Sequence, residues 1–294
     1  MASLKDIRKR IGSVKNTRQI TRAMKMVAAA KLRRSQEAIL ATRPYAYRIY
    51  SILLSLAQKE EVKHPLLVNR REKRVRLVVL AGDRGLCGAF NAGIFKEAVR
   101  FIKKKEAEGI SVTVDCIGRK AYDYLKHRAT IGTYHEGLLS GTNYGKVSLV
   151  ADVVLKNYIT EADDAIYLVY NEFKSAIQQV VTVERLAPVS LTAPSGVVGI
   201  TKAAEADRFK DYIFEPSKEE IIQSLVPRHF KMQFFRAILE SVASEHGARM
   251  SAMENATKNA SEMIDALTLD YNKARQASIT KELMEIVGGV EAMR

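Results

Sequence analysis

The sequence predicts an antiparallel coiled coil made by the two ends of the chain, with an α/β domain inserted between them. Two observations predict the coiled coil: each end of the 294-residue chain is almost free of helix-breaking residues, and each carries an apolar repeat of helical period. A third observation predicts the inserted domain, because strand-like and helix-like segments alternate in the middle of the chain. The predicted fold class is therefore α/β plus long helices.

The N-terminal helix is predicted from Leu4 to about residue 58, where Pro44 and Gly12 are the only proline and glycine. Its apolar residues recur at the three- and four-residue spacing of one helix face. They are Leu4, Ile7, Ile11 and Val14, and then Ile20, Met24, Val27 and Leu32. A helix of this length would extend roughly 80 Å, which is too long for an ordinary globular helix.

The C-terminal helix is predicted from Pro216 to Val287, with Pro227 and Gly247 as its interruptions. Ten positions spaced alternately by four and three residues hold eight apolar side chains, which is the 3.5-residue period of a coiled coil. These positions are 235, 239, 242, 246, 249, 253, 256, 260, 263 and 267, and the repeat continues at Tyr271 and Ala274. The apolar set then shifts by one position to Ile279, Leu283, Ile286 and Val290. Antiparallel pairing of the two helices is the simplest arrangement, and a parallel homodimer is the alternative.

Between the helices, four apolar runs are predicted to be strands: 75–80, 110–117, 165–170 and 177–186. Helices are predicted up to about residue 108, at 119–127 and at 147–160, and a loop at 187–206. This alternation is typical of a Rossmann-like domain with a mostly parallel sheet. The predicted divisions are an N-terminal helix at 1–60, an α/β domain at 74–207 and a C-terminal helix at 208–294.

Most of the positive charge lies in the first helix. The first fifty residues hold thirteen basic residues against Asp6 and Glu37, and so carry +11 of the formal net charge of +14. Such a segment fits nucleic acid, anionic lipid or an acidic protein surface, unless it is only a solvated helix face. The sequence shows no apolar run long enough for a membrane span and no signal peptide, and its two cysteines suggest a reducing compartment.

We predict no catalytic, metal-binding or cofactor-binding residues. In the glycine loop at 82–88 the glycines are spaced by three and three, which matches neither the dinucleotide fingerprint nor the P-loop, so the loop is interpreted as a tight turn. The five histidines form no metal-ligand spacing, and Cys87 is interpreted as a small packed residue. The acidic pair Asp163 and Asp164 is interpreted as solvated surface.

The residues leave two other classes of function to consider. A nucleic-acid-binding coiled coil is disfavoured, because the basic helix has no aromatic residue before Tyr45 and its basic residues share the helix with the apolar repeat. An oxidoreductase or another nucleotide-binding enzyme would depend on the sheet domain alone. Salt-sensitive DNA affinity would support the first class, and binding of NAD or ATP the second.

Three segments resemble the gamma subunit of F-type ATP synthases: IRKRIGSVKNTRQITRAMKMVAAAKLRRSQ at 7–36, GDRGLCGAFN at 82–91 and YNKARQASITKELMEIVGG at 271–289. They cover much of both terminal helices and the start of the sheet domain, in the family's order. The resemblance implies a noncatalytic central shaft inside a ring of three alpha and three beta subunits. Proton flow turns a membrane ring of c subunits, the shaft turns with it, and ATP is made or hydrolysed in the ring around it.

The resemblance also implies partners and a location. The partners are the alpha and beta subunits, an epsilon subunit and the c ring, with no nucleic acid and no cofactor. Membrane contact is expected only through the c ring. The lack of a transit peptide agrees with a bacterial member at the cytoplasmic face of the cell inner membrane.

Contact residues follow from the matching motifs. Met24 and Lys25 correspond to positions that pass the lever loop of the beta subunit. The residues that correspond to contacts with the catch loops of the ring are Arg275, Gln276, Thr280 and Glu282. The tail from Ile286 to Val290 corresponds to the part held in an apolar bearing, and Tyr212 and Glu215 correspond to the c-ring contact.

Overall fold

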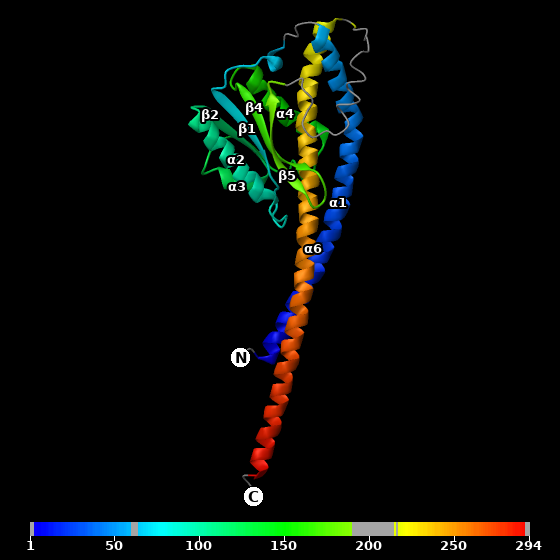
Figure 1. The fold of residues 1–294 in the computed structure, drawn as a ribbon, viewed down its shortest axis with the longest axis vertical. Coiled ribbons are helices and arrows are strands. Elements are labelled where there is room, and N and C mark those ends of the chain that lie inside the picture. The colour runs from blue at the N-terminus through cyan, green and yellow to red at the C-terminus, as the bar shows by residue number, and fades with distance from the viewer. Residues whose placement is uncertain (1–2, 60–63, 190–214, 216, 292–294) are drawn as a thin grey trace. The chain divides into compact units, whose positions relative to one another are not determined.

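A computed structural model describes residues 3–59, 64–189, 215 and 217–291. The chain divides into two compact units, one formed by residues 1–28 and 250–294, the other by residues 29–249. Two long helices belong to both units: α1 (Leu4–Lys59) and α6 (Lys218–Glu291). Both helices continue through an internal proline, Pro44 in α1 and Pro227 in α6, as the sequence predicts (Figure 1).

In the first unit, α1 and α6 pair antiparallel along a narrow seam. Lys25 Nζ lies 2.6 Å from Glu254 Oε1, and the Thr257 hydroxyl donates to the Thr21 hydroxyl at 2.8 Å, so the residue number falls on α1 as it rises on α6. On α1 a row of buried or half-buried positions alternates by three and four residues, with the half-buried Met24 beside it: Leu4, Ile7, Ile11, Val14, Arg18, Thr21, Lys25 and Ala28. The predicted antiparallel pairing is thus confirmed within one chain.

The predicted seam is wrong in register at two places. On α1, Ile20 and Val27 are 59% and 56% exposed, while their neighbours Thr21 and Ala28 are buried. On α6, Met263 is 52% exposed and Ile264 only 6%. The observed seam keeps its seven-residue repeat at both places, but an apolar residue stands one position before each buried one, so a prediction that follows apolar residues alone selects the wrong neighbour.

The second unit contains a five-stranded sheet in the order β3-β2-β1-β4-β5. The strands are β1 (Arg74–Leu80), β2 (Ser111–Ile117), β3 (Thr130–His135), β4 (Ala165–Phe173) and β5 (Gln179–Ala187). All neighbouring strands run parallel except β5, which is antiparallel to β4 and has Ile166 opposite Ala187. The predicted α/β fold class and its four strands are confirmed.

The strand β3 is absent from the sequence-based prediction. It is an edge strand with Gly132 inside it and no fully buried residue, so it lacks the continuous apolar run by which the central strands are recognised. Gly132 is required there, since a Cβ at this position would lie 2.6 Å from Asp115 Oδ1 and 2.8 Å from Arg76 Nη1.

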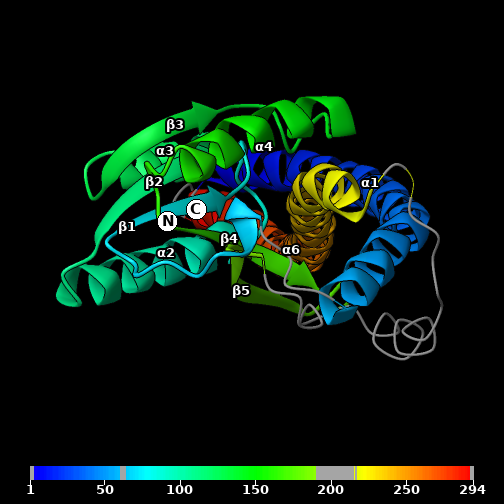
Figure 2. The ribbon, with the colours of Figure 1, turned by 90° about the horizontal axis from the view of Figure 1, so that it is seen from above.

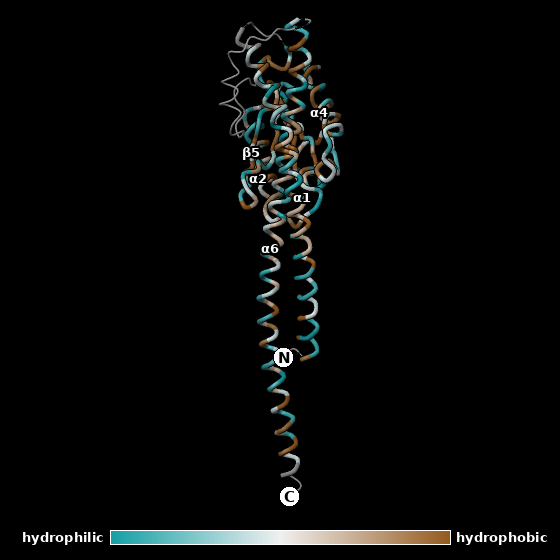
Figure 3. The backbone as a smooth tube through the Cα atoms, turned by 90° about the vertical axis from the view of Figure 1, so that its right-hand side faces the viewer, coloured by the Kyte–Doolittle hydropathy of each residue, from teal (hydrophilic) through white to brown (hydrophobic). Residues whose placement is uncertain are grey.

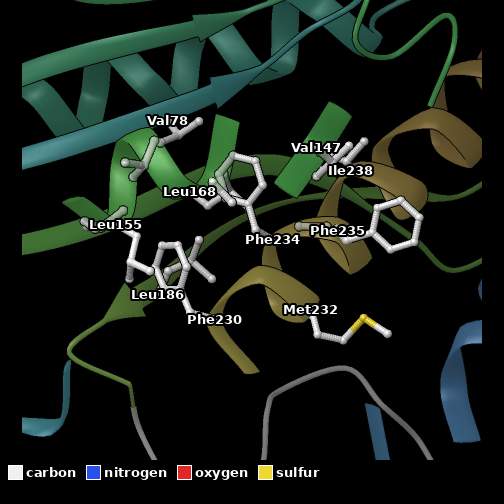
Figure 4. Close-up of a cluster of buried hydrophobic side chains, with 14 of the residues drawn as sticks. Val78, Val147, Leu155, Leu168, Leu186, Phe230, Met232, Phe234, Phe235 and Ile238 are labelled. Carbon is white, nitrogen blue, oxygen red and sulfur yellow. The ribbon is translucent and has the colours of Figure 1, made fainter. Parts of the chain in front are cut away.

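Helices cover both faces of the sheet (Figure 2). One face packs against α2 (Phe90–Ala107) and α3 (Arg119–Leu125). The other face packs against α4 (Tyr144–Ile159) and the first half of α6, joined by the short helix η1 (Pro65–Leu67) and residues of α1. In Figure 4, Phe230 and Phe234 of α6 extend toward the β4 and β5 side chains Leu168 and Leu186. This apolar burial holds α6 on the sheet.

A buried ionic cluster lies inside the parallel part of the sheet. Arg76 of β1 contacts Asp115 of β2 at 2.8 Å and Asp163, just before β4, at 2.5 Å. The prediction that Asp163 and Asp164 are solvated surface is therefore wrong, since their exposed fractions are 4% and 8%. A cationic side chain in a central strand requires buried counter-charges, and the loop before β4 supplies one of them.

Asp164, the next residue along the loop before β4, has a different role. Its Oδ2 accepts hydrogen bonds from the backbone N–H groups of Lys73 and Arg74, which begin β1. Burial opposes ionisation of this carboxyl, but the two backbone hydrogen bonds and the nearby Arg74 outweigh it and lower its pKa. The carboxylate thus fixes the start of the central strand.

Replacing Arg76 by methionine should destabilise the chain strongly. The change leaves Asp115 and Asp163 buried without their cation, and the cost of such an orphaned charge is about 3 kcal/mol or more in the free energy of unfolding. Chemical denaturation measures this loss in the free energy of unfolding. The control is Arg100→Met, because the Arg100 side chain is 74% exposed and its removal should change stability by less than about 0.5 kcal/mol. Equal effects of the two substitutions would contradict the cluster's structural role.

The seam register is tested by two neighbouring residues. Ile264→Ala removes a buried side chain and should cost about 2 kcal/mol or more. Met263→Ala removes an exposed one and should cost less than about 0.5 kcal/mol. Denaturant unfolding measures the free energy of unfolding of both variants. A larger loss for Met263→Ala than for Ile264→Ala would support the register predicted from the sequence.

Candidate partner-binding surfaces

The basic residues of α1 in the first unit lie mostly outside the seam. Those exposed there are Lys5, Arg8, Lys9, Arg10, Lys15 and Arg22. Only Arg18 and Lys25 are half-buried, at seam positions. The side of α1 that faces away from α6 therefore carries a dense positive charge, which favours an acidic partner surface.

Met24 and Lys25, which are predicted to contact the beta subunit, lie at the edge of this seam. Met24 is half-buried. Lys25 is paired with Glu254, but the two side chains are 37% and 57% exposed, so the pair is of the weak, solvated kind. Beside them Met26 and Val27 are 61% and 56% exposed. Together these residues form an apolar patch with a cation at its edge, and the sequence-based analysis missed Met26 because it assigned the neighbouring apolar residues to the seam.

The residues of α6 that are predicted to contact the catch loops lie on its outer surface. Arg275, Gln276, Thr280 and Glu282 are all exposed. The Thr280 hydroxyl donates to the Gln276 carbonyl at 3.0 Å, and the Ser278 hydroxyl donates to Glu282 Oε1 at 3.3 Å. These hydrogen bonds stay within α6, and the side chains of Arg275 and Gln276 are exposed beside them.

Beyond Ser278, every side chain of α6 described up to Gly289 is exposed. Figure 1 shows α6 continuing past the N-terminal end of α1, so the described part of α1 provides no partner for this stretch. Its apolar residues are Ile279, Leu283, Met284, Ile286 and Val287, each at least half exposed. Figure 3 shows these hydrophobic turns along the last part of α6. The side chain of Val290 lies outside the described residues.

The two residues predicted to contact a c ring precede α6. Glu215 is exposed, just before the helix begins at Lys218. Tyr212 lies outside the described residues. Of the two, only Glu215 can be located, and it is accessible to a partner.

The glycine loop after β1 is packed against α6 in the second unit. The Gly82 N–H donates to Asn91 Oδ1 at 2.9 Å, and Arg249 of α6 donates to the Gly85 carbonyl at 3.4 Å. A Cβ on Gly82 would lie 3.0 Å from Glu245 Oε1, so a carboxylate held by Arg249 occupies the space beside the loop. Gly82 permits this close approach of loop and helix, and Gly88 has a positive φ of 57°, in agreement with the interpretation as a tight turn.

The buried cysteines and histidines are packed side chains. Burial raises the pKa of the Cys87 thiol, and raises the pKa of Cys116 to about 12. Burial also lowers the pKa of His229 and of His246 to about 4, with nearby cations adding to the effect. Among the residues that the structure describes, no group of three His, Cys, Asp or Glu side chains could hold a metal ion, and no helix is long and apolar enough to cross a membrane.

The fold and its exposed surfaces define a class of protein, an antiparallel helical pair with an α/β domain and exposed charged and apolar residues on both helices. The sequence matches the ATP synthase family over residues 3–293. The ATP synthase gamma chain of Geobacter metallireducens is 49% identical over 295 residues, and that of Geotalea daltonii 48%, each match covering all of both chains. The chain belongs to the ATP synthase gamma chain family, and the family predicted from the sequence is confirmed.

Solved structures of ATP synthases contain chains with a similar fold. The central stalk and c-ring structure of the Tetrahymena thermophila mitochondrial ATP synthase contains a chain with a TM-score of 0.60 and 25% identity, covering 81% of this chain and 99% of that one. A chain in the Euglena gracilis mitochondrial ATP synthase has a TM-score of 0.65 and 22% identity, covering 99% of this chain and 94% of that one. The second likeness supports the fold.

The two native cysteines should react slowly with maleimide. Both are buried, and their raised pKa values keep them as thiols at neutral pH, so alkylation in the folded chain should be at least about tenfold slower than in denaturant. Mass spectrometry of the labelled protein measures the rate. The control is Ser13→Cys, an exposed position on α1 that should react rapidly. Fast labelling of the unsubstituted chain would contradict the packing of the glycine loop.

Proposed function

We propose that this chain is the central rotor shaft of an F-type ATP synthase. It couples proton flow through a membrane c ring to ATP synthesis and hydrolysis in a ring of alpha and beta subunits, and is itself noncatalytic. The observation that carries the proposal is the full-length match to gamma chains, combined with an α6 end that no part of the described α1 covers. The solved structures that this chain resembles are of a central stalk with a c ring and of an F1 part with a c ring.

The contacts with the alpha and beta ring are proposed on three surfaces. The basic face of α1, with Met24 and Lys25, meets acidic loops of the beta subunits. The outward side chains of Arg275, Gln276, Thr280 and Glu282 meet the catch loops. The exposed apolar end of α6, from Ile286 to Val290, is held in an apolar sleeve. An apolar bearing suits rotation, because apolar contacts are non-directional whereas hydrogen bonds favour one angle.

The remaining partners are proposed to be the c ring and an epsilon subunit. The residues before α6, Tyr212 and Glu215, meet the c ring, and an epsilon subunit accompanies the rotor. The domain divisions at 1–60, 74–207 and 208–294 are proposed as the units that perform these roles. The chain is proposed to lie at the cytoplasmic face of a bacterial inner membrane, attached only through the c ring.

Co-expression with alpha and beta subunits from the same organism tests the proposal. Native mass spectrometry should find three alpha, three beta and one copy of this chain, with an ATPase activity well above that of alpha plus beta alone. A chain that stays outside the complex would overturn the proposal, and NAD, ATP and DNA binding would then be measured on it.

Substitutions in the complex test the catch contacts. Arg275→Ala and Gln276→Ala each remove a side chain that is free to donate to a ring subunit, and the loss of about 1 kcal/mol per hydrogen bond should lower ATPase turnover by about fivefold. The control Arg100→Ala removes an exposed arginine on α2 and should leave turnover unchanged. If both α6 variants form the complex and keep normal turnover, neither side chain makes the proposed contact with the catch loops.

A further inference from the structure

A buried polar cluster joins α6 to the antiparallel edge of the sheet. Arg236 and Glu240 lie one turn apart on α6, and each is 9% exposed. They face Tyr170 and Glu172 of β4 and Glu184 of β5. The partner-binding surfaces described above do not use this cluster.

The guanidinium of Arg236 is fully engaged. Its Nε donates to Gln233 Oε1 at 2.7 Å, and its Nη2 reaches both oxygens of Glu184 at 2.6 Å. Its Nη1 donates to the Tyr170 hydroxyl oxygen at 3.2 Å and to Glu240 Oε1 at 2.9 Å. Tyr170 in turn donates to Glu184 Oε2 at 2.8 Å. The bidentate contact commits the charge of Arg236 mainly to Glu184.

Glu240 is left with a single hydrogen bond. Its Oε2 is buried and has no hydrogen-bond partner among the residues that the structure describes. Glu172, also nearly buried, adds a further carboxylate nearby, and its own cation is Lys174 at 2.6 Å. An ionised Glu240 would therefore be a surplus buried negative charge with one oxygen unsatisfied.

We propose that Glu240 is a buried proton-binding site, which holds its proton at neutral pH while α6 is packed on the sheet and releases it when that packing opens. The Asp115–Arg76–Asp163 cluster differs, because Asp115 accepts hydrogen bonds from both Arg76 and the Thr133 N–H. Burial raises the pKa of the Glu240 carboxyl, Glu172 and Glu184 add to the effect, and Arg236 opposes it without cancelling it.

The sign of the pH dependence follows from this arrangement. Because the folded pKa of Glu240 lies above its unfolded value, the folded chain binds more protons than the unfolded chain between the two values. The stability that this group contributes is fully present below the unfolded pKa and is lost as the pH rises through the folded one. The contact between α6 and the sheet therefore weakens toward alkaline pH.

Thermal unfolding of the full chain at a series of pH values tests the proposal with E240Q, which mimics the protonated carboxyl. E240Q should match the unsubstituted chain near pH 5 and exceed its Tm by about 3 °C or more near pH 9, because the amide cannot ionise. If E240Q is instead less stable at neutral and alkaline pH, Glu240 is an ionised partner of Arg236 and the proposal is wrong.

E184Q is the matched control in the same cluster. It removes the charge that Arg236 is bound to, so it should lower the Tm across the whole pH series. Parallel behaviour of E184Q and E240Q would also overturn the proposal.

Infrared spectroscopy gives a readout that does not depend on stability. The unsubstituted chain at pH 7 should show the carbonyl band of a protonated carboxylic acid, and E240Q should lack it. The absence of that band from the unsubstituted chain would contradict a protonated Glu240, even if E240Q failed to fold.

Discussion

The narrow seam of the terminal helices is the constraint on which the function of this chain depends. An apolar repeat near 3.5 residues confines the contact between α1 and α6 to one line, so most of each helix surface in the first unit remains outside. That surface carries the basic residues of α1 and the exposed polar residues of α6 that are proposed to contact partners. A wider apolar stripe would bury more area, but it would leave less surface for partners.

The second unit achieves rigidity by a different route. Its sheet is covered on both faces, and apolar packing of Phe230 and Phe234 fixes α6 against one of them. Ionic clusters inside this packing, at Arg76 and at Arg236, give orientation rather than bulk stability, because buried ion pairs gain little over apolar contacts. The glycine loop then brings β1 close to Arg249 of α6, where a nucleotide-binding sheet would keep open space.

Much of this could be predicted from the sequence. Long helices and central strands carry strong periodic signals, and the motifs at 7–36 and 271–289 are specific to one family. What failed depended on tertiary context. Asp163 is charged and near a helix end, and only the neighbouring Arg76 explains its burial. Ile264 and Met263 are both apolar neighbours, so hydrophobicity alone does not decide which one faces α1. The edge strand β3 has too few buried residues to be recognised.

The central claim is that this chain rotates. The most direct measurement fixes the alpha and beta ring to a surface and attaches an optical probe to Lys103→Cys, an exposed position on α2, using the buried state of both native cysteines for selective labelling. On addition of ATP, the probe should turn in one direction with three pauses per revolution, as a threefold catalytic ring requires. A complex that hydrolyses ATP while the bound probe stays still would contradict the account.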